Sequence, residues 1–207
     1  LQLTIDFELI FTNNCSMDGS LTCVRLIREL DPRVQVLTLS RNFGYQASVL
    51  AGISYADGDA IIVIDVDCED PPELIPVFIQ KWLIGADIVY GERGNRPEPK
   101  AILLARKLFY VLLKAVADTD IILDMAEFAL VSRRVRDVMT ANKNSFPFLR
   151  AEIGYAGFHR ESVKYDRQKR TVGKSYYNLT GMFLFAAAGI LSVSTFLLRV
   201  GAYLWPA

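Results

Sequence analysis

Short apolar runs alternate with longer amphipathic stretches along the first half of this chain, and that alternation restricts the fold more than any other feature. Strands are predicted at 7–11, 34–39, 60–64 and 87–91. Helices, with apolar residues at helical spacing, are predicted between them at 21–30, 47–55 and 72–83. Repeats of strand, helix and strand are typical of a mostly parallel sheet with right-handed crossovers and helices on both faces. The sequence therefore predicts an α/β fold.

The second half continues this pattern and then changes in character. We expect a loop rich in Gly, Pro and charge at 92–100, helices at 101–116 and 133–139, and a strand at 157–165. No charged residue occurs from 181 to 198, a length that is borderline for a bilayer span of about twenty residues. We expect an interfacial helix that leads into a span, with a buried core helix as the alternative. The chain is thus divided into a folded domain, 1–177, and a juxtamembrane amphipathic, apolar helical segment, 178–207.

Charge and cysteine content exclude several classes of protein. The 207 residues include 23 basic and 23 acidic side chains, so no overall positive field attracts nucleic acid, and none is expected as a partner. Cys15, Cys23 and Cys68 have no CxxC spacing, and His159 is the only histidine. Neither a disulfide framework nor a zinc site is indicated, and reduced, cytoplasmic surroundings fit best.

Four carboxylates directly follow the predicted strand 60–64, namely those of Asp65, Asp67, Glu69 and Asp70. Carboxylates this close repel one another unless a cation lies among them, and Mg²⁺ or Mn²⁺ is the natural partner for oxygen ligands. In an open α/β sheet, ligands bind at the carboxyl ends of strands. The loop is therefore placed to hold a metal-bridged diphosphate. The alternative is a solvated acidic turn that caps the next helix.

Seven blocks of sequence carry a resemblance to a known family. They are FTNNCSMDGS (11–20), LSRNFGYQ (39–46), the Ala-Gly pair at 51–52, GDAIIVIDVDCEDPPE (58–73), DIVYGER (87–93), EFALVSRR (127–134) and RTVGKSYY (170–177). The blocks span nearly the whole chain, which resembles the family-2 glycosyltransferases with the GT-A fold. In particular it resembles the polyprenyl-phosphate sugar transferases, such as dolichol-phosphate mannosyltransferase and the bactoprenol glucosyltransferases.

This resemblance implies a GT-A, Rossmann-like catalytic domain over 1–177, with membrane-proximal helices after it. It also implies that a first strand and its loop precede Leu1. The donor would be a nucleotide diphosphate-sugar, the acceptor an undecaprenyl or dolichyl (polyprenyl) phosphate, and the cofactor Mg²⁺ or Mn²⁺. The metal ligands that it implies are Asp65, Asp67 and Glu69, of which Asp65 faces either the ribose or the metal.

Positions that match the family's nucleotide and phosphate contacts give further substrate-binding residues. Asn14 takes the place of an Asp that recognises the base, which keeps an acceptor oxygen and loses the charge. The other residues implied on the nucleotide side are Ser16, Arg41, Asn42 and Gln46. Arg93 and Arg106 match arginines that approach the donor diphosphate or the acceptor phosphate, a task that suits a guanidinium fork. The residues implied in a loop that closes over the donor are Arg170, Lys174 and Ser175.

The catalytic residues that the resemblance implies are Asp67, Arg93 and Glu127, and the Glu127 carboxylate would hold a sugar hydroxyl. A metal would neutralise the leaving nucleoside diphosphate. A polyprenyl phosphate is already anionic near neutral pH, so its attack needs no general base. In-line attack would invert the anomeric centre. If the acceptor is a hydroxyl, Asp70 or Glu127 is the candidate base.

The predicted location is the cytoplasmic face of the cell membrane. Basic residues before the uncharged stretch, among them Arg167 and Lys169, fit an anionic inner leaflet. Two other functions stay open: transfer to a sugar hydroxyl in polysaccharide or cell-wall synthesis, and a non-catalytic relative, since Ala129 departs from the family's pattern. A homo-oligomer is compatible with the sequence, which does not fix the oligomeric state.

Overall fold

A computed structural model gives the positions of residues 5–94, 125–141 and 148–168, and of the isolated residues 111, 194, 195, 199 and 203. Two strands form a parallel pair, β1 (Leu9–Asn13) and β2 (Val34–Thr38). A second sheet has the strand order β3 (Ala60–Val63), β5 (Met125–Ser132), β4 (Ile88–Arg93) and β6 (Arg160–Tyr165). The helices are α1 (Ser20–Leu30), α2 (Tyr45–Tyr55), α3 (Ile75–Ile84), α5 (Arg133–Ala141) and α6 (Leu149–Ala156).

This arrangement confirms the α/β class, but the four-stranded sheet is mixed, not mostly parallel. Strands β3 and β4 both run antiparallel to β5, whereas β4 and β6 run parallel. The sequence pattern does not predict β5, because Glu127 interrupts its apolar run and periodicity carries no information on strand direction. All eight residues of β5 are buried, so this strand forms the centre of the sheet.

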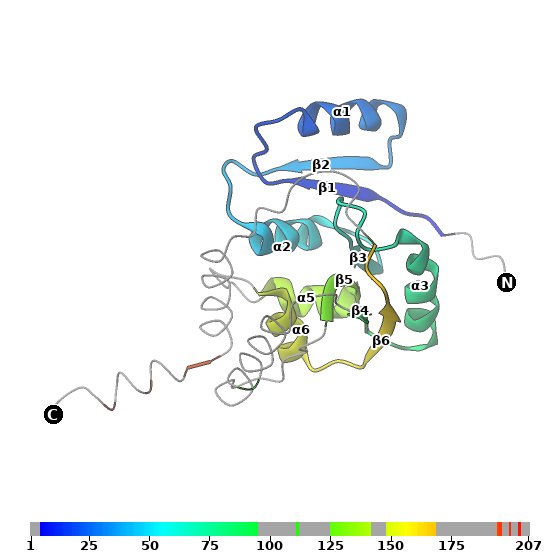
Figure 1. The fold of residues 1–207 in the computed structure, drawn as a ribbon, viewed down its shortest axis with the longest axis vertical. Coiled ribbons are helices and arrows are strands. Elements are labelled where there is room, and N and C mark those ends of the chain that lie inside the picture. Colours follow the sequence, from blue (N-terminus) through cyan, green and yellow to red (C-terminus); the bar gives the residue numbers. More distant parts are fainter. Residues whose placement is uncertain are drawn as a thin grey trace.

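The four-stranded sheet is covered on both faces, because successive side chains of a strand point to opposite sides. On one face, Ile61 and Ala129 pack with residues of α2, α5 and α6. On the other face, Ile62 and Leu130 pack with Phe78 and other residues of α3. The structure therefore confirms the expectation of helices on both faces (Figure 1).

Helix α2 links the two sheets. It packs against β1, β3 and α5, and Figure 1 shows it between the parallel pair and the four-stranded sheet. The approach to β1 is close, because a Cβ added at Gly52 would lie 2.7 Å from the Thr12 methyl carbon. Within the described ranges, β1 pairs only with β2 and β3 pairs only with β5. The strand that the family resemblance places before Leu1 stays a prediction.

The strand predicted at 157–165 begins three residues later, at Arg160. Gly157 has a left-handed backbone with a φ of 68° and ends helix α6. Glycine is favoured at such a position because it has no Cβ. The sequence pattern does not predict α6 itself, which occupies the eight residues before this glycine.

Every helix in the described ranges is too short or too polar to cross a bilayer. The helix predicted at 101–116 and the juxtamembrane segment 178–207 lie outside the described residues, apart from the isolated positions given above. The division of the chain at residue 177 and the membrane-proximal helices stay predictions.

Candidate active site

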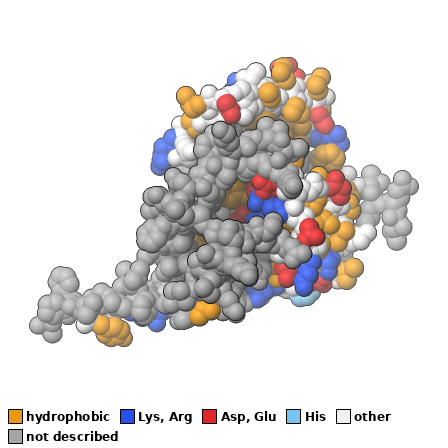
Figure 2. Space-filling model, in the orientation of Figure 1, with side chains coloured by type: hydrophobic (Ala, Val, Ile, Leu, Met, Phe, Trp, Pro, Cys, Tyr) orange, Lys and Arg blue, Asp and Glu red, His pale blue; other side chains and the backbone are white. Residues whose placement is uncertain are grey.

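Loops that follow strands β1, β2 and β3 come together on one side of the molecule. The Asn14 side chain donates to the Asn42 side chain at 2.9 Å and accepts from the Phe43 amide at 3.0 Å, which joins the first loop to the second. The Tyr45 hydroxyl donates to Asp65 at 2.8 Å, which joins the second loop to the third. Acidic and basic side chains gather near the middle of the face shown in Figure 2. The structure thus brings together predicted residues from three separate sequence blocks.

The first two loops present exposed polar groups. Ser16 is exposed, and its backbone amide donates to the Asn13 side chain at 2.9 Å. The Arg41 guanidinium lies 3.9 Å from the centroid of the Phe43 ring and donates to the Asn42 carbonyl at 3.3 Å. These groups suit a polar ligand such as a nucleotide, and their contact with one stays a prediction.

Two cysteines in the site loops adopt a left-handed backbone, with φ of 61° at Cys15 and 58° at Cys68. In the part of the chain that the structure describes, no other residue except glycine has a positive φ. Such conformations cost about 1–3 kcal/mol each and cluster at functional sites. Cys15 follows Asn14, and Cys68 lies between Asp67 and Glu69, so both strained positions fall within the predicted site.

The acidic loop after β3 directs its carboxylates to different partners. Asp65 is half-buried and accepts the Tyr45 hydrogen bond. Burial raises the pKa of Asp65, the bond from Tyr45 lowers it, and the charges of Asp67 and Asp70 raise it again. The Asp67 side chain accepts a hydrogen bond from the Glu69 amide at 3.1 Å, which holds these two acidic residues side by side.

A cationic side chain lies between Asp67 and Glu69. The Arg167 guanidinium forms an ion pair with Glu69 and lies 3.9 Å from Asp67. The Gln168 amide donates to the Glu69 carbonyl at 2.9 Å, which holds the segment after β6 on the acidic loop. In the sequence, Arg167 belongs to the basic segment that fits an anionic membrane surface, and the structure places its guanidinium on the acidic loop.

The predicted metal ligands do not form a cluster of three. Among the residues whose positions are described, no group of three or more His, Cys, Asp or Glu side chains is arranged to hold a metal ion, because Asp65 faces Tyr45 instead. Asp67 and Glu69 nevertheless converge on one positive charge. Since Mg²⁺ is usually bound by one or two carboxylates together with substrate phosphates, this pair fits such an ion.

Asp70 is fully buried and faces Arg93 at the end of β4. Its Oδ2 lies 3.6 Å from Arg93 Nη2, and its Oδ1 accepts a hydrogen bond from the Tyr165 hydroxyl. Burial and this hydrogen bond raise the pKa of Tyr165 to about 12, so the hydroxyl remains a donor near neutral pH. Arg93 Nε also donates to the Tyr165 oxygen at 3.5 Å. These contacts hold the Arg93 guanidinium next to the acidic loop.

Gly91 leaves room for the Tyr165 ring. A Cβ at Gly91 would lie 2.5 Å from Tyr165 Cε1, at a point where the pairing of β4 with β5 is irregular. We expect Gly91→Ala to lower the free energy of unfolding by about 1–3 kcal/mol, the usual cost of overpacking. Chemical denaturation measures the change. Gly19→Ala is the control, because no atom lies within 4 Å of a Cβ there, and equal stability of the two variants would contradict the close approach.

Glu127 is buried on the central strand β5. Its Oε1 lies 3.2 Å from Nε of Arg150, in the first turn of α6. Gln46, which the resemblance places on the nucleotide side, has its carbonyl oxygen 2.8 Å from the Leu149 amide, from which it accepts a hydrogen bond. Gln46 therefore links α2 to the start of α6, and Arg150 links α6 to the carboxylate on β5.

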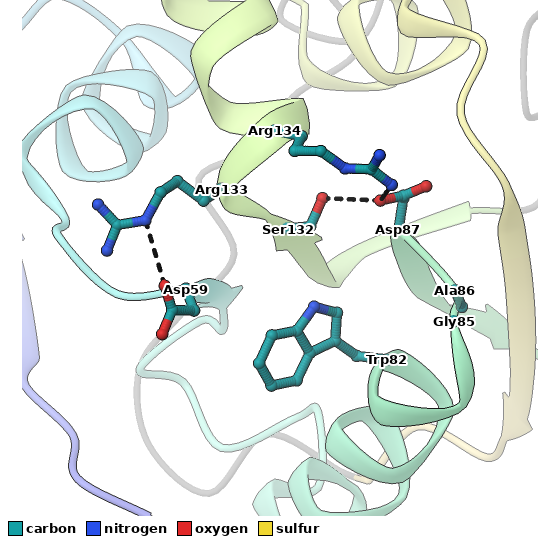
Figure 3. Close-up of a pocket in the computed structure, with 8 residues that line it drawn as sticks. All are labelled: Asp59, Trp82, Gly85, Ala86, Asp87, Ser132, Arg133 and Arg134. Carbon is teal, nitrogen blue, oxygen red and sulfur yellow. Dashed lines mark hydrogen bonds and ion pairs between the residues drawn. The ribbon is translucent and has the colours of Figure 1, made fainter.

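A separate pocket lies at the end of the sheet where β3 and β4 begin (Figure 3). Asp59 and Asp87 line it and directly precede β3 and β4, whereas the acidic loop follows β3. Arg133 lies 3.3 Å from Asp59, and Arg134 lies 2.6 Å from Asp87. Because both carboxylates have a guanidinium partner, we assign these pairs a structural role.

Four predicted site residues lie outside the described residues: Arg106, Arg170, Lys174 and Ser175. Sequence reasoning in turn missed the side chains that hold the predicted ones in place, namely Tyr45, Arg150, Arg167 and Tyr165. Each acts on a partner that is distant along the chain, by 20 positions for Tyr45 and by 95 for Tyr165. No local motif signals such pairs, so only the tertiary structure identifies them.

Solved structures share the fold of this chain. The crystal structure of mannosyl-3-phosphoglycerate synthase from Rubrobacter xylanophilus is 13% identical, covers 96% of this chain and 66% of that chain, and gives a TM-score of 0.56. A structure described as a mycobacterial protein is 18% identical, covers 89% of this chain and 63% of that chain, and also gives 0.56. These similarities show a GT-A type of fold and nothing further.

Residues 2–139 match the family described as Glycosyl transferase family 2, and the chain belongs to that family. It is 39% identical over 202 residues to the uncharacterized glycosyltransferase YkcC of Bacillus subtilis (strain 168), covering 96% of this chain and 62% of the relative. It is 35% identical over 202 residues to a bactoprenol glucosyl transferase of Shigella phage SfV, covering 96% of this chain and 65% of the relative. The chain thus spans less than two thirds of the length of these curated relatives.

Proposed function

We propose that this chain is the catalytic part of an inverting, metal-dependent glycosyltransferase that moves a sugar from a nucleotide diphosphate-sugar to a polyprenyl phosphate. The observation that carries this proposal is the 35% identity, over 96% of the chain, to proteins named bactoprenol glucosyl transferase. The similarity extends past residue 139, where the family match ends, so it includes the part of the chain that holds Arg150 and Arg167.

The charges of the site support transfer between two phosphorylated substrates. When bound on Asp67 and Glu69, Mg²⁺ or Mn²⁺ would supply positive charge to the leaving diphosphate. Arg93, fixed by Asp70 and Tyr165, offers a guanidinium fork to phosphate oxygens. A phosphate acceptor is itself the nucleophile, and it needs no residue to remove a proton.

We also propose that the enzyme works at the cytoplasmic face of the cell membrane. Residues 1–177 would form the catalytic domain and 178–207 the juxtamembrane segment. The support is the uncharged stretch 181–198, which follows a basic segment.

A second candidate function is transfer to a sugar hydroxyl in polysaccharide or cell-wall synthesis. One observation favours it: burial raises the pKa of Glu127. A carboxylate with a raised pKa is more basic and accepts a proton more readily, and a hydroxyl acceptor needs a general base.

Donor screening separates these functions. Membranes that contain the expressed chain and a polyprenyl phosphate are incubated with a panel of radiolabelled nucleotide sugars. The proposal predicts label in the lipid extract with one donor, and activity that sediments with the membranes. Label that appears only in water-soluble glycans would favour the hydroxyl acceptor. Absence of transfer with every donor would favour a non-catalytic relative.

A further inference from the structure

The buried pair of Glu127 and Arg150 contains polar atoms that the protein does not satisfy. The two side chains are 11% and 15% exposed, and Oε1 lies 3.2 Å from Nε. Among the described residues, neither Glu127 Oε2 nor Arg150 Nε has a hydrogen-bond partner of good geometry. A buried acceptor without a partner is unfavourable, because it has lost its hydrogen bonds to water. Such an oxygen is therefore placed to accept a hydrogen bond from a bound molecule.

Arg150 is held at this place by the start of α6. Phe148 precedes the helix and provides no side-chain cap. Gln46 accepts the hydrogen bond of the Leu149 amide, one of the amides that a helix start leaves without an internal partner. Because Arg150 is the next residue, the bond from α2 fixes the backbone that carries its guanidinium.

The groups around Glu127 shift its pKa in opposite directions. Burial raises the pKa of Glu127, and Arg150 on α6 is the largest influence that lowers it, followed by the Gln46 hydrogen bond. Asp65 after β3 raises this pKa, and Arg93 on β4 lowers it. Loss of the Arg150 charge would therefore favour the protonated carboxyl, which is a poorer acceptor.

We infer that Arg150 is a positioning residue for Glu127, the carboxylate to which the family resemblance assigns a sugar hydroxyl. The inference rests on the proposed sugar transfer and adds the residue that orients this carboxylate. Its location fits, because Gln46, which accepts the hydrogen bond of the Leu149 amide beside Arg150, directly follows Tyr45, whose hydroxyl donates to Asp65. A site built to bond a hydroxyl rejects a ligand that lacks it.

Calorimetry with a matched pair of ligands tests this inference without relying on turnover. The probes are the nucleotide sugar of the panel that binds the wild-type protein most tightly and its nucleoside diphosphate. Arg150→Met and Glu127→Gln are expected to weaken binding of the nucleotide sugar by roughly tenfold or more, the scale of one hydrogen bond to a charged group. Binding of the nucleoside diphosphate should not change. Arg150→Lys should restore part of the loss, because it keeps the charge.

Arg136→Met is the matched control. Its side chain is 16% exposed, close to the 15% of Arg150, but it contacts Asp137 and the Ala56 carbonyl. The control should leave both affinities unchanged. If Arg150→Met weakens both probes equally, or lowers only the melting temperature, the residue is structural and the inference is wrong.

The pH dependence of sugar binding gives a second readout. In Arg150→Met, the loss of sugar affinity on the acidic side should begin at higher pH than in the wild type, because removal of the cation raises the pKa of Glu127. Glu127→Gln should abolish this acid-dependent loss of sugar affinity, and the double variant should behave like Glu127→Gln. If the loss of affinity in Arg150→Met begins at the same pH as in the wild type, the inference is wrong. Binding of the nucleotide sugar is measured separately from transfer to lipid. A failure of lipid transfer in the donor screen would therefore leave these binding results unchanged.

Discussion

Asp67→Ala is expected to reduce sugar transfer by at least about 10²–10³-fold, the usual effect of removing one preorganised electrostatic group. Its side chain is 21% exposed, lies on a loop and contacts Arg167, not the apolar core. The substitution should therefore leave the fold intact while it removes a carboxylate that we propose as a metal ligand. The loss should appear in kcat, because charge on the leaving diphosphate grows in the transition state.

Initial rates of transfer, with and without EDTA, measure this effect. The wild-type protein should lose activity in chelator and regain it with Mn²⁺ or Mg²⁺. Asp59→Ala is the control, because this aspartate flanks the other end of the same strand β3 and its side chain is 81% exposed. Full turnover by Asp67→Ala, or by the wild-type protein in chelator, would contradict the metal assignment.

Arg93→Ala should have the second-largest effect. The lost charge-assisted hydrogen bond to a phosphate corresponds to about 1.5–3 kcal/mol in the transfer barrier. The substitution also leaves the fully buried Asp70 without its guanidinium neighbour, and breaking a buried pair on one side is usually destabilising by about 3–5 kcal/mol. We therefore expect lower activity together with a lower melting temperature. Arg93→Lys should rescue both only in part, because an ammonium lacks the planar fork.

Rates at limiting donor and at limiting acceptor show which phosphate Arg93 serves. Arg33→Ala is a suitable control, since this arginine is 51% exposed and pairs with Asp31 just before β2 begins. If Arg93→Ala retains wild-type rates under both conditions, its guanidinium only stabilises Asp70.

The sequence predicts those parts of the fold that depend on local pattern. The continuous apolar run before the acidic loop indicates a strand buried on both faces. Strand β3 is packed on both faces, between α3 on one side and α2 and α5 on the other, but of its residues only Ile61 is buried. The direction of β5 could not be predicted, because pairing between segments that are distant along the chain leaves no periodic signal. The sequence pattern predicts the start of β6 too early, because Gly157 ends helix α6 and does not belong to the strand.

In the candidate site, too, the sequence predicts some residues, and only tertiary contacts reveal the others. Residues that belong to blocks of family sequence, such as Asn14, Asn42 and Asp65, were predicted, and the structure brings their loops together. Arg150 and Arg167 were not predicted as site residues, because their roles follow only from tertiary contacts with Glu127 and Glu69. An isolated arginine in a sequence is indistinguishable from a surface charge until its partner is known.

The central claim is that the acceptor is a polyprenyl phosphate. A comparison of a polyprenyl phosphate with the corresponding polyprenol tests this claim most directly. Both lipids are supplied in the same membranes with the donor identified by screening, and labelled lipid is measured after organic extraction. We expect transfer to the phosphate, through a sugar-phosphate bond that mild acid cleaves, and no transfer to the alcohol. Equal labelling of the two lipids, or labelling of a glycan hydroxyl in their absence, would contradict the account.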